Sequence, residues 1–174
     1  MAEIASNLQT VRVKIAAACQ RVRRSPDEVT LLAVSKLQPS ALIVAAYQAG
    51  QRDFGENYAQ ELRDKSVELA HLPGLRWHAI GTLQRNKVKY VAKAACSFQA
   101  LCSLEIAEEL GSRRHERPLP VLLEVNIAGE AGKSGIAPLE LPKLVEAVRR
   151  VPGVDLQGLM CMPPQPEPPA SWTQ

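Results

Sequence analysis

Short apolar runs alternate with helix-like segments along almost the whole chain, and this rhythm limits the possible folds more than any other feature. The runs predict strands over residues 30–35, 52–55, 76–81, 97–101, 120–127 and 154–160. Their starts recur about every 20 to 35 residues, which is the length of one strand-and-helix unit. Several runs, such as Val121-Leu122-Leu123, are continuously apolar, which is typical of strands buried on both faces of a parallel sheet. The rhythm therefore predicts an α/β protein built on a parallel sheet.

The segments between these runs have the apolar spacing and the end signals of helices. Residues 39–48 begin with Pro39 and are followed by Gly50, a typical start and stop for a helix. Ser103 can cap residues 104–110, which are closed by Gly111. Further helices are predicted at the N-terminus, where apolar residues recur at helical spacing from Ile4 to Val22, and over residues 58–69, 83–94 and 139–151.

Two architectures fit this alternation: a doubly wound open sheet and a TIM-type (β/α) barrel. No glycine-rich dinucleotide-binding turn follows the first predicted strand, where the chain reads Ser35-Lys36-Leu37-Gln38. We therefore favour the barrel, in which the carboxyl ends of all strands share one rim. The residues at these ends are mostly polar groups and glycines: Ser35, Lys36, Glu56, Asn57, Gly81, Thr82, Cys102, Ser103, Asn126 and Met160. This grouping predicts one small pocket at the rim.

Lys36 is the rim residue with the most distinctive chemistry. It follows the apolar run from Leu31 to Ser35, at the point where a buried strand ends. We expect an amine placed there to lose part of its hydration, which favours the neutral, nucleophilic form. Such an amine can hold a carbonyl cofactor as a Schiff base. The alternative is a strand-end lysine whose ammonium group extends into water.

Composition and charge argue against nucleic-acid and membrane functions. The formal net charge is only +3, and the densest basic cluster, Arg113, Arg114, His115 and Arg117, is typical of a solvated loop. Aromatic residues make up 4% of the chain, so platforms for base stacking are not expected. No apolar stretch is long enough to cross a bilayer, and the N-terminus lacks the layout of a secretory signal. We therefore expect neither a nucleic-acid partner nor a membrane partner.

The cysteines and histidines argue against a metal centre. Cys19, Cys96, Cys102 and Cys161 form no CxxC pair, which is also unlike a disulfide framework. The histidines show no metal-ligand spacing either. Reduced thiols in a cytoplasmic protein are the simplest interpretation.

Several motifs, taken in order, resemble those of one known family. They are Leu32-Ala33-Val34-Ser35-Lys36, Phe54-Gly55-Glu56-Asn57-Tyr58, Trp77-His78-Ala79-Ile80-Gly81-Thr82-Leu83-Gln84-Arg85-Asn86-Lys87, Val125-Asn126-Ile127, Lys133-Ser134-Gly135 and Gly158-Leu159-Met160. This ordered set resembles the pyridoxal phosphate homeostasis protein family, whose single domain is related to the N-terminal barrel of alanine racemase. The resemblance runs from about residue 3 to residue 162. It implies a (β/α) barrel of the alanine racemase N-terminal type.

The resemblance also implies a cofactor site. The family holds pyridoxal 5′-phosphate (PLP) as an internal aldimine on the strand-end lysine, which is Lys36 here, and the resemblance implies no established turnover, so no catalytic residue is expected. Asn57 matches the family asparagine near the cofactor, where its amide can both donate and accept hydrogen bonds. The alternative for Asn57 is a turn residue that satisfies its own backbone. Met160 either packs on the face of the cofactor ring or fills the core.

Three further polar features have simpler explanations. His78 invites a general-base role, but a hydrogen-bonded core histidine is the favoured interpretation, and the sequence does not show which face of its strand points inward. Arg85, Lys87 and Lys89 at a helix start are read as a solvated face in preference to a phosphate site. The glycine-bearing residues 129–135 have no P-loop spacing and are read as a plain connection.

The C-terminal part departs from the family pattern. Family members continue with a serine-rich turn and an Arg-Ile-Gly-Thr-like strand end that grip the cofactor phosphate, and neither motif occurs in this sequence. We expect residues 1–162 to form a PLP-binding barrel domain that is C-terminally truncated relative to the family, with about six strands and open edges. We expect residues 163–174 to form a proline-rich, disordered tail. Each missing charge-assisted contact to the phosphate is worth about 1.5 to 3 kcal/mol, so weaker binding is expected.

Three functions remain open at this point. The favoured one is a PLP-binding protein for intracellular homeostasis of vitamin B6, which holds the cofactor on Lys36 without catalytic turnover and releases it to apo PLP enzymes. The second is a PLP-dependent amino-acid racemase in which Lys36 also carries a proton. The third is a barrel fragment that binds no cofactor.

Overall fold

The computed structural model of the chain describes residues 2–114, 116–130, 132 and 134–163. Its centre is a parallel sheet whose strands pair in the order β1-β2-β3-β4-β5-β6. The strands are β1 (Ala33–Val34), β2 (Asp53–Glu56), β3 (Arg76–Ala79), β4 (Ser97–Leu101), β5 (Leu119–Glu124) and β6 (Val154–Met160). Every strand therefore pairs with the next one along the chain, whereas a doubly wound sheet reverses its order in the middle. The structure confirms the predicted barrel-type winding.

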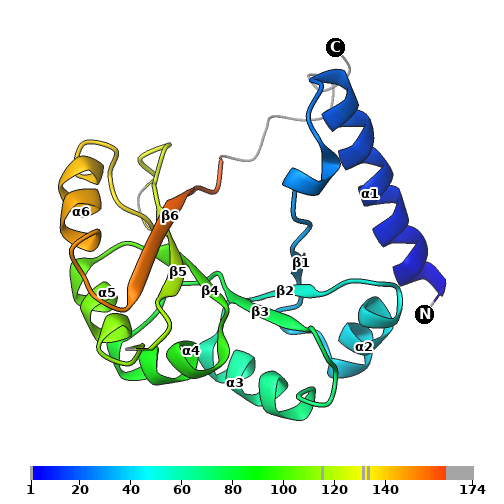
Figure 1. Cartoon of the computed structure of the whole chain (residues 1–174), viewed down its shortest axis with the longest axis horizontal. Coiled ribbons are helices and arrows are strands. Elements are labelled where there is room, and N and C mark those ends of the chain that lie inside the picture. Colours follow the sequence, from blue (N-terminus) through cyan, green and yellow to red (C-terminus); the bar gives the residue numbers. More distant parts are fainter. Residues whose placement is uncertain (1, 115, 131, 133, 164–174) are drawn as a thin grey trace.

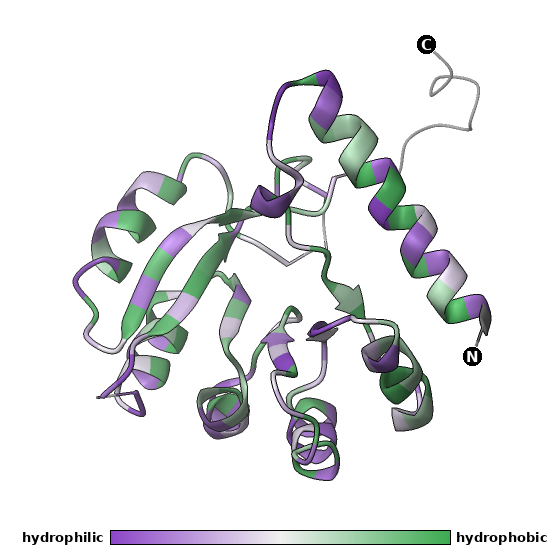
Figure 2. Cartoon of the chain, turned by 45° about the vertical axis from the view of Figure 1, so that its right-hand side comes forward, coloured by the Kyte–Doolittle hydropathy of each residue, from purple (hydrophilic) through white to green (hydrophobic). Residues whose placement is uncertain are grey.

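Helices cover the outer side of the curved sheet (Figure 1). They are α1 (Ala2–Arg21), α2 (Ser40–Gln48), α3 (Ala59–Glu68), α4 (Val88–Ala94), α5 (Leu104–Gly111) and α6 (Leu141–Val148), with short 3-10 turns η1 (Pro26–Glu28) and η2 (Arg85–Lys87). In Figure 2 the helices alternate between hydrophobic and hydrophilic bands, as amphipathic helices do. Helix α1 stands on the side of β1 and is tied to the end of α2 by the Arg12 guanidinium, which donates to the carbonyl of Ala49 at 3.1 Å.

The predicted elements exist, and most differences lie at their ends. The Ser103 cap is confirmed, because its hydroxyl accepts from the backbone N–H of Ile106 at 3.3 Å. The last predicted helix, 139–151, is shorter in the structure because Pro142 fits only the first turn of a helix, and α6 begins one residue before it. The first predicted strand, 30–35, shrinks to β1, which has a hydrogen-bonded neighbour on one side only.

The hydrophobic core lies between the sheet and the helices. Phe54 and Trp77 meet there with ring centroids 6.0 Å apart, and Leu62 of α3 is fully buried. Full burial of side chains of this size stabilises a fold by about 1.5 to 3 kcal/mol each. The opposite, inner face of the sheet carries the alternate residues: a Cβ atom on Gly55 would lie 2.8 Å from Cδ1 of Ile80. The two faces of each strand therefore have different roles, packing on the outside and lining the barrel on the inside.

The barrel does not close within the described residues. Strands β1 and β6 form the two edges of the sheet and face an opening between them (Figure 1). Val34 of β1 and Leu159 of β6 are both more than half exposed, which agrees with the expected open edges. Most of the predicted tail, residues 164–174, lies outside the described residues. No helix in the described part of the chain is long and apolar enough to span a membrane.

Candidate functional site

Lys36 lies at the carboxyl end of β1, as predicted, in a tight turn that leads to α2. The backbone N–H of Ser35 still donates to the carbonyl of Gly55 at 2.9 Å, so the pairing with β2 continues up to the residue before Lys36. The side chain of Lys36 is exposed. The expected loss of hydration is therefore wrong for this structure, because β1 is an edge strand and no seventh or eighth strand covers it within the described residues. The amine is accessible to a ligand that approaches the rim.

Asn57 lies beside Lys36 at the same rim. It follows β2, and the register of Val34 opposite Gly55 places it next to Lys36. A Cβ atom on Gly81 would lie 2.5 Å from the backbone oxygen of Asn57, so only glycine allows this close approach after β3. No hydrogen bond from the Asn57 side chain is formed within the part of the chain that the structure describes. Its amide therefore remains available to a bound group.

Met160 reaches the rim from the other edge of the sheet. It is the last residue of β6, opposite Glu124 of β5, and β6 is separated from β1 by the opening (Figure 1). Its side chain is partly buried and packs against the hydrophobic core. The structure therefore brings Lys36 and Asn57 together and leaves Met160 on the far side of the opening. Both interpretations of Met160, ring contact and core filler, remain predictions.

A buried charged network lies directly behind Lys36, between the sheet and α3, and sequence reasoning missed it. Glu56 is 1% exposed and Lys65 is 6% exposed. The Lys65 ammonium donates to Glu56 Oε1 at 2.8 Å, to Glu61 Oε1 at 2.6 Å and to the carbonyl of Ser35 at 2.7 Å. The Ser35 hydroxyl donates to Glu56 Oε1 at 2.6 Å. Lys65 and Glu56 both bond to Ser35, the residue before Lys36. Glu61 bonds to Leu37, the residue after it.

The electrostatics of this network are dominated by burial. Burial raises the pKa of Glu56 above its ordinary value, although hydrogen bonds from Lys65 and Ser35 act in the opposite direction. The second carboxylate oxygen, Oε2, is buried and has no hydrogen-bond partner among the described residues. The only local signal for the network is the spacing of Glu61 and Lys65, which lie one helical turn apart on one face of α3.

A second polar network lies at the opposite, amino-terminal end of the strands. Asp53 accepts two hydrogen bonds from the Arg76 guanidinium, at 2.7 and 2.5 Å, and lies 2.8 Å from Nε2 of His78. The other ring nitrogen, Nδ1, lies 2.7 Å from the Ser97 hydroxyl. Burial raises the pKa of Asp53, but the hydrogen bonds from Arg76 and His78 outweigh it and hold the pKa below its ordinary value. His78 is thus a hydrogen-bonded histidine, as the favoured interpretation predicted, and its ring is held by Asp53 and Ser97, the first residues of β2 and β4.

The basic stretch after β3 forms surface ion pairs. Arg85 lies 3.1 Å from Glu105 and 3.3 Å from Glu109, and its side chain is 65% exposed. This pairing supports the interpretation of the stretch as a solvated face. Within the described residues, no cluster of three or more histidine, cysteine, aspartate or glutamate side chains has the arrangement of a metal site.

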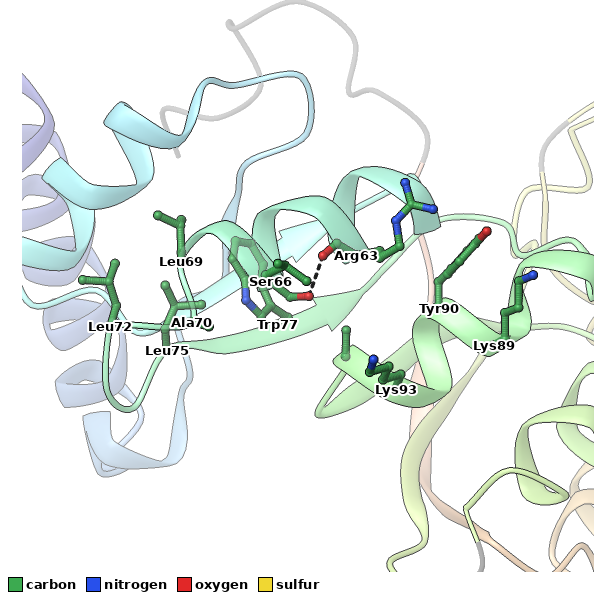
Figure 3. A pocket seen from close by; sticks show the side chains of 12 residues that line it. Arg63, Ser66, Leu69, Ala70, Leu72, Leu75, Trp77, Lys89, Tyr90 and Lys93 are labelled. Carbon is green, nitrogen blue, oxygen red and sulfur yellow. Dashed lines mark hydrogen bonds between the residues drawn. The ribbon is translucent and has the colours of Figure 1, made fainter.

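A groove of about 700 Å³ lies on the outer surface between α3 and α4 (Figure 3). Its floor includes Trp77 and Leu75, and Lys89, Lys93 and Tyr90 stand along one side of it (Figure 3). The Arg63 guanidinium lies 4.7 Å from the centroid of the Tyr90 ring. None of the lining residues lies at the carboxyl end of a strand, so this groove is separate from the Lys36 rim.

Comparison with known proteins connects the rim to a family. A family model described as "Alanine racemase, N-terminal domain" matches residues 6–173. The pyridoxal phosphate homeostasis protein of Pseudomonas aeruginosa is 47% identical over 165 residues, which cover 94% of this chain and 71% of that protein. The protein of the same name from Escherichia coli K12 is also 47% identical, over 167 residues, with the same shares of each chain.

Solved structures agree with this assignment. PipY of Synechococcus elongatus, solved with PLP bound, is 33% identical, has a TM-score of 0.80 and is matched over 94% of this chain and 72% of its own. Alanine racemase from E. faecalis is 19% identical with a TM-score of 0.63 over 88% of this chain and 41% of its own, which shows a shared fold only. The order of the strands, the rim and the similarity over nearly the whole chain lead to one conclusion: this chain belongs to the pyridoxal phosphate homeostasis protein family, within the wider alanine racemase N-terminal domain family.

Proposed function

We propose that this chain binds PLP at Lys36 and takes part in the homeostasis of vitamin B6. The observation that carries the proposal is the accessible Lys36 amine at the carboxyl end of β1, where the active sites of (β/α) barrels are built. The names of the relatives and the PLP-bound structure of PipY support it.

The residues at the rim fit the cofactor. PLP would supply an aldehyde at the rim, and the exposed Lys36 amine would hold it through a C=N bond formed with release of one water. The Asn57 amide, free of other hydrogen bonds among the described residues, can donate to the ring hydroxyl or accept from the attached nitrogen. Met160 ends β6 on the far side of the opening from β1, and its thioether can offer an apolar contact to the pyridine ring of PLP.

The test is direct detection of the covalent bond. The purified chain is mixed with PLP, the absorbance of the C=N bond is recorded, and the bond is then reduced with borohydride and located by peptide mass. We expect the label on Lys36 and its loss in Lys36→Ala. An absorbance like that of the parent in Lys36→Ala, or a label on other lysines of the parent, would contradict the proposal.

We further propose that the bound cofactor is stored and handed over without turnover, and that the recipients are apo PLP enzymes in the cytoplasm. The support for storage is that the relatives are named as homeostasis proteins, and that the carboxylates next to the Lys36 turn, Glu56 and Glu61, are engaged by Lys65 and by the turn itself. PLP-loaded chain is incubated with single-enantiomer alanine in deuterated water. Exchange of the α-proton at the rate of free PLP supports storage, whereas faster exchange that depends on Lys36 supports the racemase alternative.

Transfer is tested with an apo PLP enzyme whose activity reports the cofactor it receives. The loaded chain should restore activity while the Lys36 absorbance falls in step. An apo enzyme that stays inactive in the presence of loaded chain, but responds to free PLP, would remove delivery from the proposal and leave storage alone. A parent chain that acquires no label at all would favour the alternative hypothesis that this barrel binds no cofactor.

A further inference from the structure

We propose that helix α3 holds the two peptide groups that flank Lys36, so that Glu61 and Lys65 are positioning residues for the attachment of PLP. The inference rests on the proposed function of Lys36. It concerns residues that touch neither the lysine amine nor its ligand and act through the backbone of the turn.

The hydrogen bonds reach the turn on both sides of Lys36. The Lys65 ammonium donates to the carbonyl of Ser35 at 2.7 Å, which is the acceptor of the peptide that enters Lys36. The Glu61 Oε1 atom accepts from the backbone N–H of Leu37 at 2.7 Å, which is the donor of the peptide that leaves Lys36. Lys65 and Glu61 also bond to each other at 2.6 Å. The Lys36 backbone is therefore fixed by two adjacent turns of a single helix.

The turn needs this support because its backbone is strained. Leu37 has a φ of 59°, in the left-handed region that residues with a Cβ atom rarely adopt. Its side chain is 73% exposed, so burial of the leucine does not compensate for the strain. Two hydrogen bonds hold this conformation: the charge-assisted bond that the Leu37 N–H donates to Glu61, and the bond that the Gln38 N–H donates to the Ser35 carbonyl at 3.0 Å.

Stability alone does not explain the buried pair of Glu56 and Lys65. Replacing a buried ion pair with apolar residues is often neutral or stabilising, so such a pair is weak evidence for stabilisation. Here Glu56 receives bonds from Lys65 and from the Ser35 hydroxyl, and it holds both against the end of β1. Lys65 is thereby fixed in the position from which it reaches the Ser35 carbonyl. We infer that the buried pair, although costly to bury, maintains the geometry of the Lys36 turn.

The test compares variants of α3 in the full chain. Glu61→Ala removes the acceptor of the Leu37 N–H, whereas Glu61→Gln keeps an oxygen that can accept the same bond. Glu68→Ala is the matched control, because Glu68 lies on the same helix and accepts from the Ser40 hydroxyl at 2.6 Å, at the start of α2 beyond the Ser35–Leu37 peptide groups. Unfolding by urea is recorded for each variant, so that a general loss of stability is separated from an effect on the turn.

The first measurement is amide hydrogen exchange at Leu37 without PLP. We expect exchange to become about tenfold faster in Glu61→Ala, because its protecting bond is worth at least about 1.4 kcal/mol, and to stay near the parent rate in the other two variants. The second measurement is the equilibrium constant for PLP attachment. We expect it to fall about tenfold in Glu61→Ala and to be largely restored in Glu61→Gln.

The outcomes separate this inference from the function on which it rests. If Glu61→Ala loses stability but keeps the parent values for Leu37 exchange and PLP attachment, α3 is only a structural support and the inference is overturned. If the parent takes up no PLP, the proposed function fails. Amide exchange at Leu37, which is measured without PLP, then decides whether Glu61 stabilises the turn. The double variant Glu56→Gln/Lys65→Met, which leaves no buried charge unpaired, checks Lys65: attachment should weaken although the chain remains folded.

Discussion

Strand β2 carries a carboxylate at each end, and the two lie in opposite environments. Asp53 begins the strand and meets the planar guanidinium of Arg76 through two parallel hydrogen bonds. Arg76 remains about half exposed, so the charges of this pair stay in contact with water. Glu56 ends the strand, is almost completely buried and shares one oxygen between Lys65 and Ser35. The pKa of Asp53 is lowered and that of Glu56 is raised.

The opposite pKa shifts indicate which end of β2 contributes to stability. At Asp53, the donors outweigh burial, so the ionised form is favoured by the fold. At Glu56, burial outweighs the donors, and the charge is kept there at a cost. In (β/α) barrels the amino-terminal mouth serves stability and the carboxyl rim serves function. The two carboxylates of β2 follow that division.

The largest expected effect comes from breaking the buried pair at the rim. Lys65→Met should lower the free energy of unfolding by about 3 to 5 kcal/mol, because it leaves the Glu56 carboxylate buried without a cation. Urea unfolding measures the change. Glu56→Gln in the same chain should recover most of it, since the neutral amide needs no cation. A loss below about 1 kcal/mol in Lys65→Met would show that Glu56 does not need its buried cation, and would contradict the costly ion pair assigned to this end of the strand.

At the other end, removing one charge should cost less. Asp53→Asn replaces charge-assisted bonds by neutral ones, and we expect a loss of about 1 to 2 kcal/mol, because Arg76 can return to water. The control is Asp64→Asn, which breaks the exposed pair of Asp64 and Arg63 and should leave stability close to that of the parent, because water screens this pair. PLP attachment should be unchanged in both variants. Weaker attachment in Asp53→Asn would place the amino-terminal network within the binding site.

The comparison also shows how far the sequence could predict this molecule. The parallel sheet was predictable because strands buried between two layers read as unbroken apolar runs, such as Val121-Leu122-Leu123. The neighbours Lys36 and Asn57 were predictable because strand ends of a barrel meet at one rim. The exposure of Lys36 was not, because hydration depends on whether the next strand covers β1, which is a property of the tertiary structure.

The two carboxylate networks escaped prediction for the same reason. Lys65 reads as a solvated helix residue, and only the packing of α3 against β1 and β2 buries it against Glu56. The facing of His78 was also undetermined, because a strand of four residues with Trp77 and His78 in succession gives no preference for either side. Asp53 selects the inner face for His78 once the register of β2 and β3 is fixed.

The opposite pKa shifts predict opposite pH dependence. A carboxylate with a lowered folded-state pKa stabilises above its unfolded value, and that stability is lost as the pH falls through the folded value. Asp53→Asn should therefore flatten the loss of stability below about pH 4. A carboxylate with a raised folded-state pKa binds its proton more tightly when folded, so its contribution becomes less favourable as the pH rises above about 4.5. Glu56→Gln should gain stability relative to the parent over that range in urea titrations, and parallel curves for the two variants would contradict the assignment.

The smallest effect compares one substitution at both ends. Ser35→Ala removes the hydroxyl that donates to Glu56 at 2.6 Å, and Ser97→Ala removes the hydroxyl that lies 2.7 Å from Nδ1 of His78. Each loss should cost about 1 kcal/mol of unfolding free energy, because each removes a single hydrogen bond. Only Ser35→Ala should also weaken PLP attachment at Lys36, since Ser35 and Glu56 support the turn while Ser97 lies at the far mouth. Equal attachment constants in the two variants would mean that the rim network is a structural support like the one at Asp53, and that the division between the ends of β2 has no bearing on the cofactor.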